Sequence, residues 1–288
     1  MQVNRRDFLK AGSAGAGAML LYYGLGPKNK LDSYLSSSGK RAMLYDANKC
    51  VGCRACQSAC KSWNKLREES VGYGGIYENP GSLSGTTWTL IKARELGLNG
   101  TNRLFFRKYQ CFHCTEASCE AVCPVAAISH NNEAVVINQK LCIGCGYCVQ
   151  ACPFDVAHRD EETGTSRKCT LCVDRTSKGL NPACVEACPA EAVIWGDRSE
   201  FIAEGKRRVQ SLVASGWEKA TLYGENGLGG LTVLYVLPES ASVFGLPEFP
   251  RMATHNVWGQ WVSGVIAAGA IAAIPFWLLF KKKSKSTH

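Results

Sequence analysis

The chain has 288 residues, and its sixteen cysteines fall into four runs of four. The runs are Cys50, Cys53, Cys56 and Cys60; Cys111, Cys114, Cys119 and Cys123; Cys142, Cys145, Cys148 and Cys152; and Cys169, Cys172, Cys184 and Cys188. The first and third runs have the spacing C-x2-C-x2-C-x3-C, whereas four residues precede the third cysteine in the second run and eleven in the fourth. A proline follows the last cysteine of the second, third and fourth runs. A chain with this pattern must fold so that its cysteines act in groups of four.

The spacing is typical of loops that bind cubic iron-sulfur clusters through thiolates. In proteins with two such clusters, the first three cysteines of a run bind one cluster and the fourth binds the other. We therefore expect the two middle runs to exchange their last cysteines, and the two outer runs to do the same. The prediction is four [4Fe-4S] clusters: cluster 1 at Cys50, Cys53, Cys56 and Cys188; cluster 2 at Cys60, Cys169, Cys172 and Cys184; cluster 3 at Cys111, Cys114, Cys119 and Cys152; and cluster 4 at Cys123, Cys142, Cys145 and Cys148.

Three other uses of the cysteines agree less well with the pattern. Cysteines separated by two residues make poor disulfides and good chelates, so a disulfide framework does not explain the repeated pairs. Structural zinc sites use C-x2-C pairs, but they do not require a third and a fourth cysteine followed by proline. A Rieske-type centre needs two histidine ligands, and His113 is the only histidine inside a run. We expect His113 to line the wall around a cluster instead.

The formal net charge of +9 does not indicate a nucleic-acid-binding protein. Each cluster with four thiolates carries about two negative charges when oxidised, so four clusters offset most of this excess. The sequence contains no dinucleotide fingerprint and no phosphate-binding glycine loop. Because every predicted cluster has four cysteine ligands, no iron is left open for a substrate. The composition and motifs therefore indicate transfer of single electrons, with no catalytic site in this chain.

Residues 1–41 are predicted to form an N-terminal export segment. Arg5 and Arg6 precede a small-residue apolar stretch from Ala11 to Gly26, an arrangement that resembles a twin-arginine signal. Iron-sulfur clusters are inserted in the reducing cytoplasm, so a protein that carries them must cross the membrane folded, as the twin-arginine route allows. No A-x-A cleavage site follows the apolar stretch, and removal of the signal stays open.

Residues 42–198 are predicted to form an α+β domain of tandem bacterial ferredoxin-like type, with two dicluster modules and insertions. Strands are expected in both modules, and the long insertion at residues 69–100 either shields a cluster or docks a partner subunit. The expected strands cover residues 42–46, 86–93, 103–110, 134–138 and 193–196.

Residues 199–256 are predicted to be an extension. We expect Ser199 to cap a helix that runs to about Ala214, one strand within residues 224–237, and an extended proline-containing linker at residues 238–250.

Residues 257–280 contain no charged side chain over 24 positions, which is long enough for one helix to cross the membrane. A basic tail at residues 281–288 follows and is expected to stay in the cytoplasm. The cluster domain would then lie on the periplasmic side of the inner membrane, in contact with lipid. A buried helix of a soluble protein is the alternative for this segment.

The order and spacing of the four runs resemble the four-cluster iron-sulfur subunits of bacterial respiratory oxidoreductases, such as those of formate dehydrogenase, nitrate reductase and dimethyl sulfoxide reductase. With the twin-arginine motif and the C-terminal span, the chain is most similar to HybA-type subunits of membrane-bound periplasmic nickel-iron hydrogenases. This resemblance implies electron transfer between the small and large hydrogenase subunits, which oxidise hydrogen, and a polytopic quinone-reactive membrane subunit. It also implies the cluster ligands given above.

Three other functions stay open. The chain can be the beta subunit of a periplasmic formate dehydrogenase or a related molybdopterin oxidoreductase, which shares the clusters and the C-terminal helix. A free-standing ferredoxin-like carrier is disfavoured by the predicted membrane span. A redox-inert scaffold held by zinc or disulfides would lack iron and acid-labile sulfide.

Overall fold

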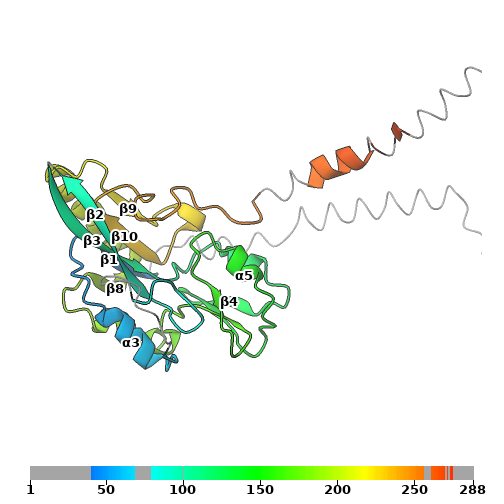
Figure 1. Ribbon diagram of the computed structural model, residues 1–288, viewed down its shortest axis with the longest axis horizontal. Helices are drawn as coiled ribbons and strands as arrows, with labels where there is room; N and C mark the ends of the chain where they lie inside the picture. The colour runs from blue at the N-terminus through cyan, green and yellow to red at the C-terminus, as the bar shows by residue number, and fades with distance from the viewer. Residues whose placement is uncertain are drawn as a thin grey trace, which may run out of the picture. The chain divides into compact units, whose positions relative to one another are not determined.

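The computed structural model describes residues 40–68, 79–98, 100–255, 261–269, 271 and 273–274. Its central element is a four-stranded sheet with the strand order β8-β1-β10-β9 (Figure 1). β1 (Arg41–Asp46) pairs antiparallel with β8 (Val193–Asp197) and parallel with β10 (Val233–Leu237), and β9 (Thr221–Tyr223) pairs antiparallel with β10. Every residue of β10 is buried, as is every residue of β1 after its first. Strands that are covered on both faces are expected to be continuous apolar runs, as β10 is throughout and β1 is from Ala42 to Tyr45.

The predicted strands at residues 42–46 and 193–196 correspond to β1 and β8, but the place of β10 was not predicted. β10 is separated from β1 by almost the whole chain, and its Val233 and Tyr235 are in register with Met43 and Tyr45. Residues beyond the predicted domain boundary at residue 198 therefore complete the sheet from which the first cysteine run departs.

One face of this sheet is covered by α8 (Arg198–Ala214), which packs against all four strands. Its N-cap is Asp197, and the prediction of Ser199 as the cap was wrong. The Asp197 carboxylate Oδ1 accepts hydrogen bonds from the backbone N–H groups of Ser199 at 2.7 Å and Glu200 at 3.2 Å. A carboxylate placed directly before the first helical turn satisfies these donors better than a serine inside that turn. The hydrogen bond from the Ser199 hydroxyl lowers the pKa of Asp197.

A long hairpin of β2 (Leu90–Leu98) and β3 (Thr101–Tyr109) precedes the second cysteine run. β2 begins four residues later than the strand predicted at residues 86–93. The Ser84 hydroxyl accepts hydrogen bonds from the backbone N–H groups of Thr86 at 3.1 Å and Thr87 at 2.9 Å. This local turn uses the donors that a strand would need for its ladder, and so it delays the strand.

The remaining elements are short and surround the cysteines. Two small hairpins are formed by β4 (Ile128–Asn131) with β5 (Ala134–Ile137), and by β6 (His158–Arg159) with β7 (Ser166–Arg167). The helices are α3 (Ala55–Trp63), α4 (Ser118–Ala121), α5 (Tyr147–Gln150), α6 (Val173–Thr176), α7 (Ala183–Glu186) and the 3-10 turn η1 (Gly227–Gly229).

Residues 238–250 do not form the extended linker that their proline content suggested. Phe244 is fully buried and Leu246 nearly so. Arg107, on the buried side of β3, donates a hydrogen bond to the carbonyl oxygen of Phe244, and the Tyr223 hydroxyl donates to that of Pro247 at 2.8 Å. Apolar side chains between the prolines anchor this segment on the domain.

Four predicted segments lie wholly or partly outside the described residues. These are the export signal, part of the insertion at residues 69–100, much of the predicted span at residues 257–280 and the basic tail at residues 281–288. Residues 261–269 are helical. Within the part of the chain that the structure describes, no helix has both the length and the apolar character to cross a membrane.

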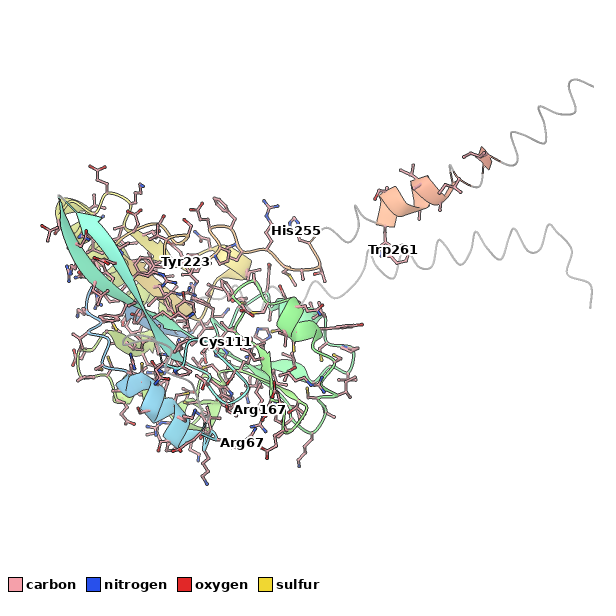
Figure 2. All side chains as sticks on the ribbon, viewed as in Figure 1. Arg67, Cys111, Arg167, Tyr223, His255 and Trp261 are labelled. Carbon is pink, nitrogen blue, oxygen red and sulfur yellow. The ribbon has the colours of Figure 1, made fainter. Side chains whose placement is uncertain are left out.

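An ion-pair network joins the segment after the first run to the loop between the third and fourth runs. The carboxylate of Asp160, which is buried, contacts Arg67 at 2.6 Å and Arg167 at 3.1 Å. Both arginines lie close together in Figure 2. Gly85 packs directly behind this carboxylate, because a Cβ atom at position 85 would lie 2.5 Å from the Asp160 Cα.

We expect Gly85→Ala to lower the free energy of unfolding by about 1–3 kcal/mol, since the methyl group overpacks against main chain that cannot move freely. Gly81→Ala is the matched control, because a Cβ atom at position 81 meets no atom within 4 Å. Denaturant unfolding followed by circular dichroism measures both variants. Equal midpoints for the two would contradict this packing.

Candidate metal centres

The third cysteine of every run occupies the second position of a helix. Cys56, Cys119, Cys148 and Cys184 hold this position in α3, α4, α5 and α7. The fourth cysteine follows four residues later, about one helical turn along the chain. α3 packs against α7 and α4 packs against α5. These contacts place the first run beside the fourth, and the second run beside the third.

The loop that follows the first cysteine of each run passes through left-handed backbone conformations. Gly144 and Gly146 in the third run have φ of +69° and +78°, and glycine adopts this region without steric cost. In the first run, Gly52 and Arg54 occupy the equivalent positions with φ of +68° and +62°. The turn directs backbone N–H groups at sulfur: His113 N–H lies 3.4 Å from the Cys111 Sγ, for example.

Three small cavities are lined by cysteines. Each contains three cysteines of one run and the fourth cysteine of the neighbouring run. The first is lined by Cys50, Cys53, Cys56 and Cys188, the second by Cys60, Cys169, Cys172 and Cys184, and the third by Cys123, Cys142, Cys145 and Cys148.

The remaining four cysteines also lie together. Burial raises the pKa of the Cys114 thiol well above its ordinary value, and the nearby thiolates of Cys111, Cys152 and Cys119 raise it further. All sixteen cysteines are therefore grouped in fours, each group with three members from one run and one from another.

Electrostatics in these groups favour a cationic ligand. Burial raises the pKa of the Cys56 thiol to about 12. Burial and the neighbouring thiolates raise the pKa of the Cys169 thiol to about 12 as well. Four thiolates in one enclosed space would be costly without compensating positive charge, which iron provides. In the described part of the chain, no group of three or more His, Cys, Asp or Glu side chains is arranged to hold a single metal ion. The four sulfur donors of each group fit an iron-sulfur cluster, which thiolates bind.

Two buried lysines stand among the thiols, and sequence reasoning missed both. Lys108 donates to the Thr89 hydroxyl at 2.6 Å and to the Gln110 side chain. Burial alone lowers the pKa of Lys108, but the thiolates of Cys184 and Cys56 outweigh it and raise that pKa. Lys168 is buried in the same way, and its pKa is also raised, mainly by Cys111 and Cys119. A lysine inside a polar or strand-like stretch carries no sequence signal of burial.

His113 lies fully buried, and burial lowers its pKa well below the ordinary value. Its Nδ1 atom accepts a hydrogen bond from the Val135 N–H at 3.0 Å. Cys111, the first residue of the same run, is buried, and Figure 2 labels it near the middle of the domain in that view.

The four cysteine groups follow one another in a single order. Cys56 of the first group interacts electrostatically with Cys184 of the second, Cys169 of the second with Cys111 of the third, and Cys119 of the third with Cys148 of the fourth. Cys53 and Cys145, in the first and fourth groups, are exposed. A chain of redox groups with these positions would be accessible at both ends.

The sequence matches known families in the regions that contain these groups. Residues 102–198 match the 4Fe-4S dicluster domain family, and residues 41–62 match a 4Fe-4S binding domain family. The chain is 40% identical over 237 residues to the iron-sulfur subunit of nitrate-inducible formate dehydrogenase from Escherichia coli K12, which covers 80% of this chain and 81% of the relative. The chain belongs to the family of iron-sulfur subunits of formate dehydrogenases and related oxidoreductases.

Two further relatives of this iron-sulfur subunit extend the comparison. The formate dehydrogenase iron-sulfur subunit of Haemophilus influenzae is 40% identical over 242 residues, covering 80% of this chain and 77% of the relative. The hydrogenase-2 operon protein HybA of Escherichia coli O157:H7 is 31% identical over 326 residues, covering 99% of this chain and 97% of the relative.

Family membership confirms several predictions. The sixteen cysteines of the iron-sulfur subunit fit four [4Fe-4S] clusters, in tandem ferredoxin-like dicluster modules. It is an electron-transfer subunit of an oxidoreductase complex, and catalysis belongs to other subunits. Residues 2–22 match the twin-arginine translocation signal family, which indicates export to the periplasm.

Proposed function

We propose that the iron-sulfur subunit conducts electrons along one path, from cluster 1 through clusters 2 and 3 to cluster 4. The four cysteine sets predicted from the sequence would be the ligands of these clusters. The observation that supports the proposal is that Cys188, from the fourth run, lines one cavity with Cys50, Cys53 and Cys56 of the first run.

The chemistry supplied by the bound clusters is one-electron oxidation and reduction. The protein holds the four sets in order, because α3 packs on α7 and α4 on α5. It surrounds the two middle sets more completely than the two outer ones, since Cys53 and Cys145 are the exposed members. Its backbone N–H groups donate to cysteine sulfur, as Ala127 does to Cys123 at 3.2 Å, and such hydrogen bonds tune potentials.

We propose a formate-oxidising enzyme as the catalytic partner. The identity of 40% to formate dehydrogenase iron-sulfur subunits exceeds the 31% to HybA, and this reverses the preference for hydrogenase that the two chain ends suggested. Hydrogenase small and large subunits are the second candidate, because HybA aligns with 99% of this chain.

We further propose that residues 257–280 cross the inner membrane and that the lysine-containing tail stays in the cytoplasm. The charge-free stretch of 24 residues and the lysines after it support this placement. Residues 1–41 would serve export, and residues 42–256 would hold the clusters on the periplasmic face. A polytopic, quinone-reactive membrane subunit is then the partner at the other end of the path.

Metal analysis of the complex, purified in detergent through a tag on this chain, tests the partner. We expect molybdenum or tungsten together with formate-dependent dye reduction. Nickel with hydrogen-dependent dye reduction would instead identify the hydrogenase. Release of this chain from membranes by salt alone, without detergent, would contradict the proposed span.

A further inference from the structure

The His113 ring has a defined tautomer. Its Nδ1 atom accepts the Val135 N–H, so Nδ1 carries no proton, and the single ring proton must be on Nε2. His113 is 1% exposed, and among the described residues Nε2 has no hydrogen-bond partner. A buried donor left without an acceptor loses the hydrogen bonds that water would give it, which is unfavourable. The Nε2–H group of His113 therefore needs a hydrogen-bond acceptor that the described part of the polypeptide does not provide.

Lys168 is held next to this ring by the same residue. Its Nζ atom donates to the carbonyl oxygen of Val135 and to that of Cys169 at 3.3 Å. The N–H and C=O groups of one strand residue point to the same edge of the strand. Val135 thus fixes His113 with one group and Lys168 with the other, and no strand of the described chain pairs with that edge of β5.

Lys168 faces sulfur from two cysteine groups. The thiolates of Cys111 and Cys119 in the third group and of Cys169 in the second act electrostatically on its ammonium group, and Cys111 also forms a side-chain hydrogen bond with it. This is the junction between the two dicluster modules. Lys168 is 3% exposed, so solvent screens the charge of its side chain little.

We propose that His113 and Lys168 are positioning residues that raise the reduction potential of cluster 3, His113 by donating its Nε2–H to a sulfur of that cluster and Lys168 by its positive charge. The inference rests on the proposed ligand set Cys111, Cys114, Cys119 and Cys152. Reduction adds one negative charge to a cluster, so a nearby cation and a hydrogen bond both stabilise the reduced state. The electron would then be favoured at the junction where it must cross from one module to the other.

Two conservative substitutions separate this role from packing. Lys168→Gln keeps hydrogen-bond donors for the two carbonyl oxygens and removes the charge. His113→Asn keeps an acceptor near the Val135 N–H and removes the Nε2 donor. Lys140→Gln is the matched control, because Lys140 is exposed. Each variant is purified anaerobically as the full chain in its complex, and its four redox couples are titrated by electron paramagnetic resonance.

In Lys168→Gln we expect the ratio of reduced to oxidised cluster 3, at a fixed potential, to fall at least tenfold, which is about 59 mV for one electron. We expect a smaller fall in the same direction for His113→Asn. The couples of clusters 1 and 4, and all couples of Lys140→Gln, should stay at their wild-type values. Unchanged cluster 3 potentials in variants that retain four clusters would overturn the inference and leave the proposed function intact.

A measurement on the protein without substitutions tests the role of His113 even if the variants fail to assemble. In protein labelled with ¹⁵N-histidine, pulsed electron paramagnetic resonance of reduced cluster 3 should show coupling to one nitrogen and to one exchangeable proton. The absence of both couplings would overturn the role of His113. The absence of the clusters themselves from the wild-type protein would overturn the ligand assignment on which the inference rests.

Discussion

Replacing Cys188 with serine is expected to disrupt the cluster of the first cysteine run and to spare the cluster of its own run. Cys188 lines the cavity of Cys50, Cys53 and Cys56, whereas Cys169, Cys172 and Cys184 share theirs with Cys60. Serine is a weaker ligand for iron than a thiolate, which these clusters prefer. Of the four clusters, one should lose an iron or shift its spectrum strongly.

The reciprocal variant is the control. Cys60→Ser should disrupt the cluster of Cys169, Cys172 and Cys184 and leave that of Cys50, Cys53 and Cys56 unchanged. Mössbauer and electron paramagnetic resonance spectra of the two variants, each compared with wild type, identify the affected cluster. If each serine instead disrupted the cluster of its own run, the exchange of fourth cysteines would be wrong.

Phe244→Ala is expected to lower the free energy of unfolding by about 3–5 kcal/mol, the cost of removing a buried phenylalanine from a core. Phe244 is fully buried, and its carbonyl oxygen accepts a hydrogen bond from Arg107, a buried residue of β3 in the long hairpin. The loss therefore affects packing around β3, which leads into the second cysteine run.

Phe249→Ala provides the matched control, because Phe249 lies five residues further along the same segment and is 81% exposed. Anaerobic denaturant unfolding followed by circular dichroism compares the variants. A large decrease for Phe244→Ala and none for Phe249→Ala would show that residues 238–250 belong to the folded domain. Equal unfolding midpoints would mean that residues 238–250 form a linker, as first predicted.

The metal centres could be predicted from sequence because cluster loops depend on local spacing. Three of the four ligands of a cluster lie within one short loop, and a helical turn carries the fourth to its neighbour. The same locality explains the agreement at β1, β5 and β8, which flank the runs.

Features that depend on distant contacts could not be predicted. β10 lies beside β1 across nearly the whole chain, and no local pattern encodes such a pairing. The burial of Lys168 could not be predicted, because a lysine between an arginine and a cysteine is normally exposed to solvent. In the structure Lys168 is buried, and the thiolates around it raise its pKa and so favour its charged form. The cap of α8 was predicted at Ser199 because serine is a good N-cap, and only the observed carboxylate contacts identify Asp197 instead.

Quantitative iron and acid-labile sulfide analysis of anaerobically purified protein tests the central claim most directly. Four [4Fe-4S] clusters require four iron atoms and four sulfides for each cysteine group, with no zinc in their place. We predict this full content together with a brown colour that dithionite bleaches. A colourless protein, or one with zinc instead of iron, would contradict the electron-transfer function.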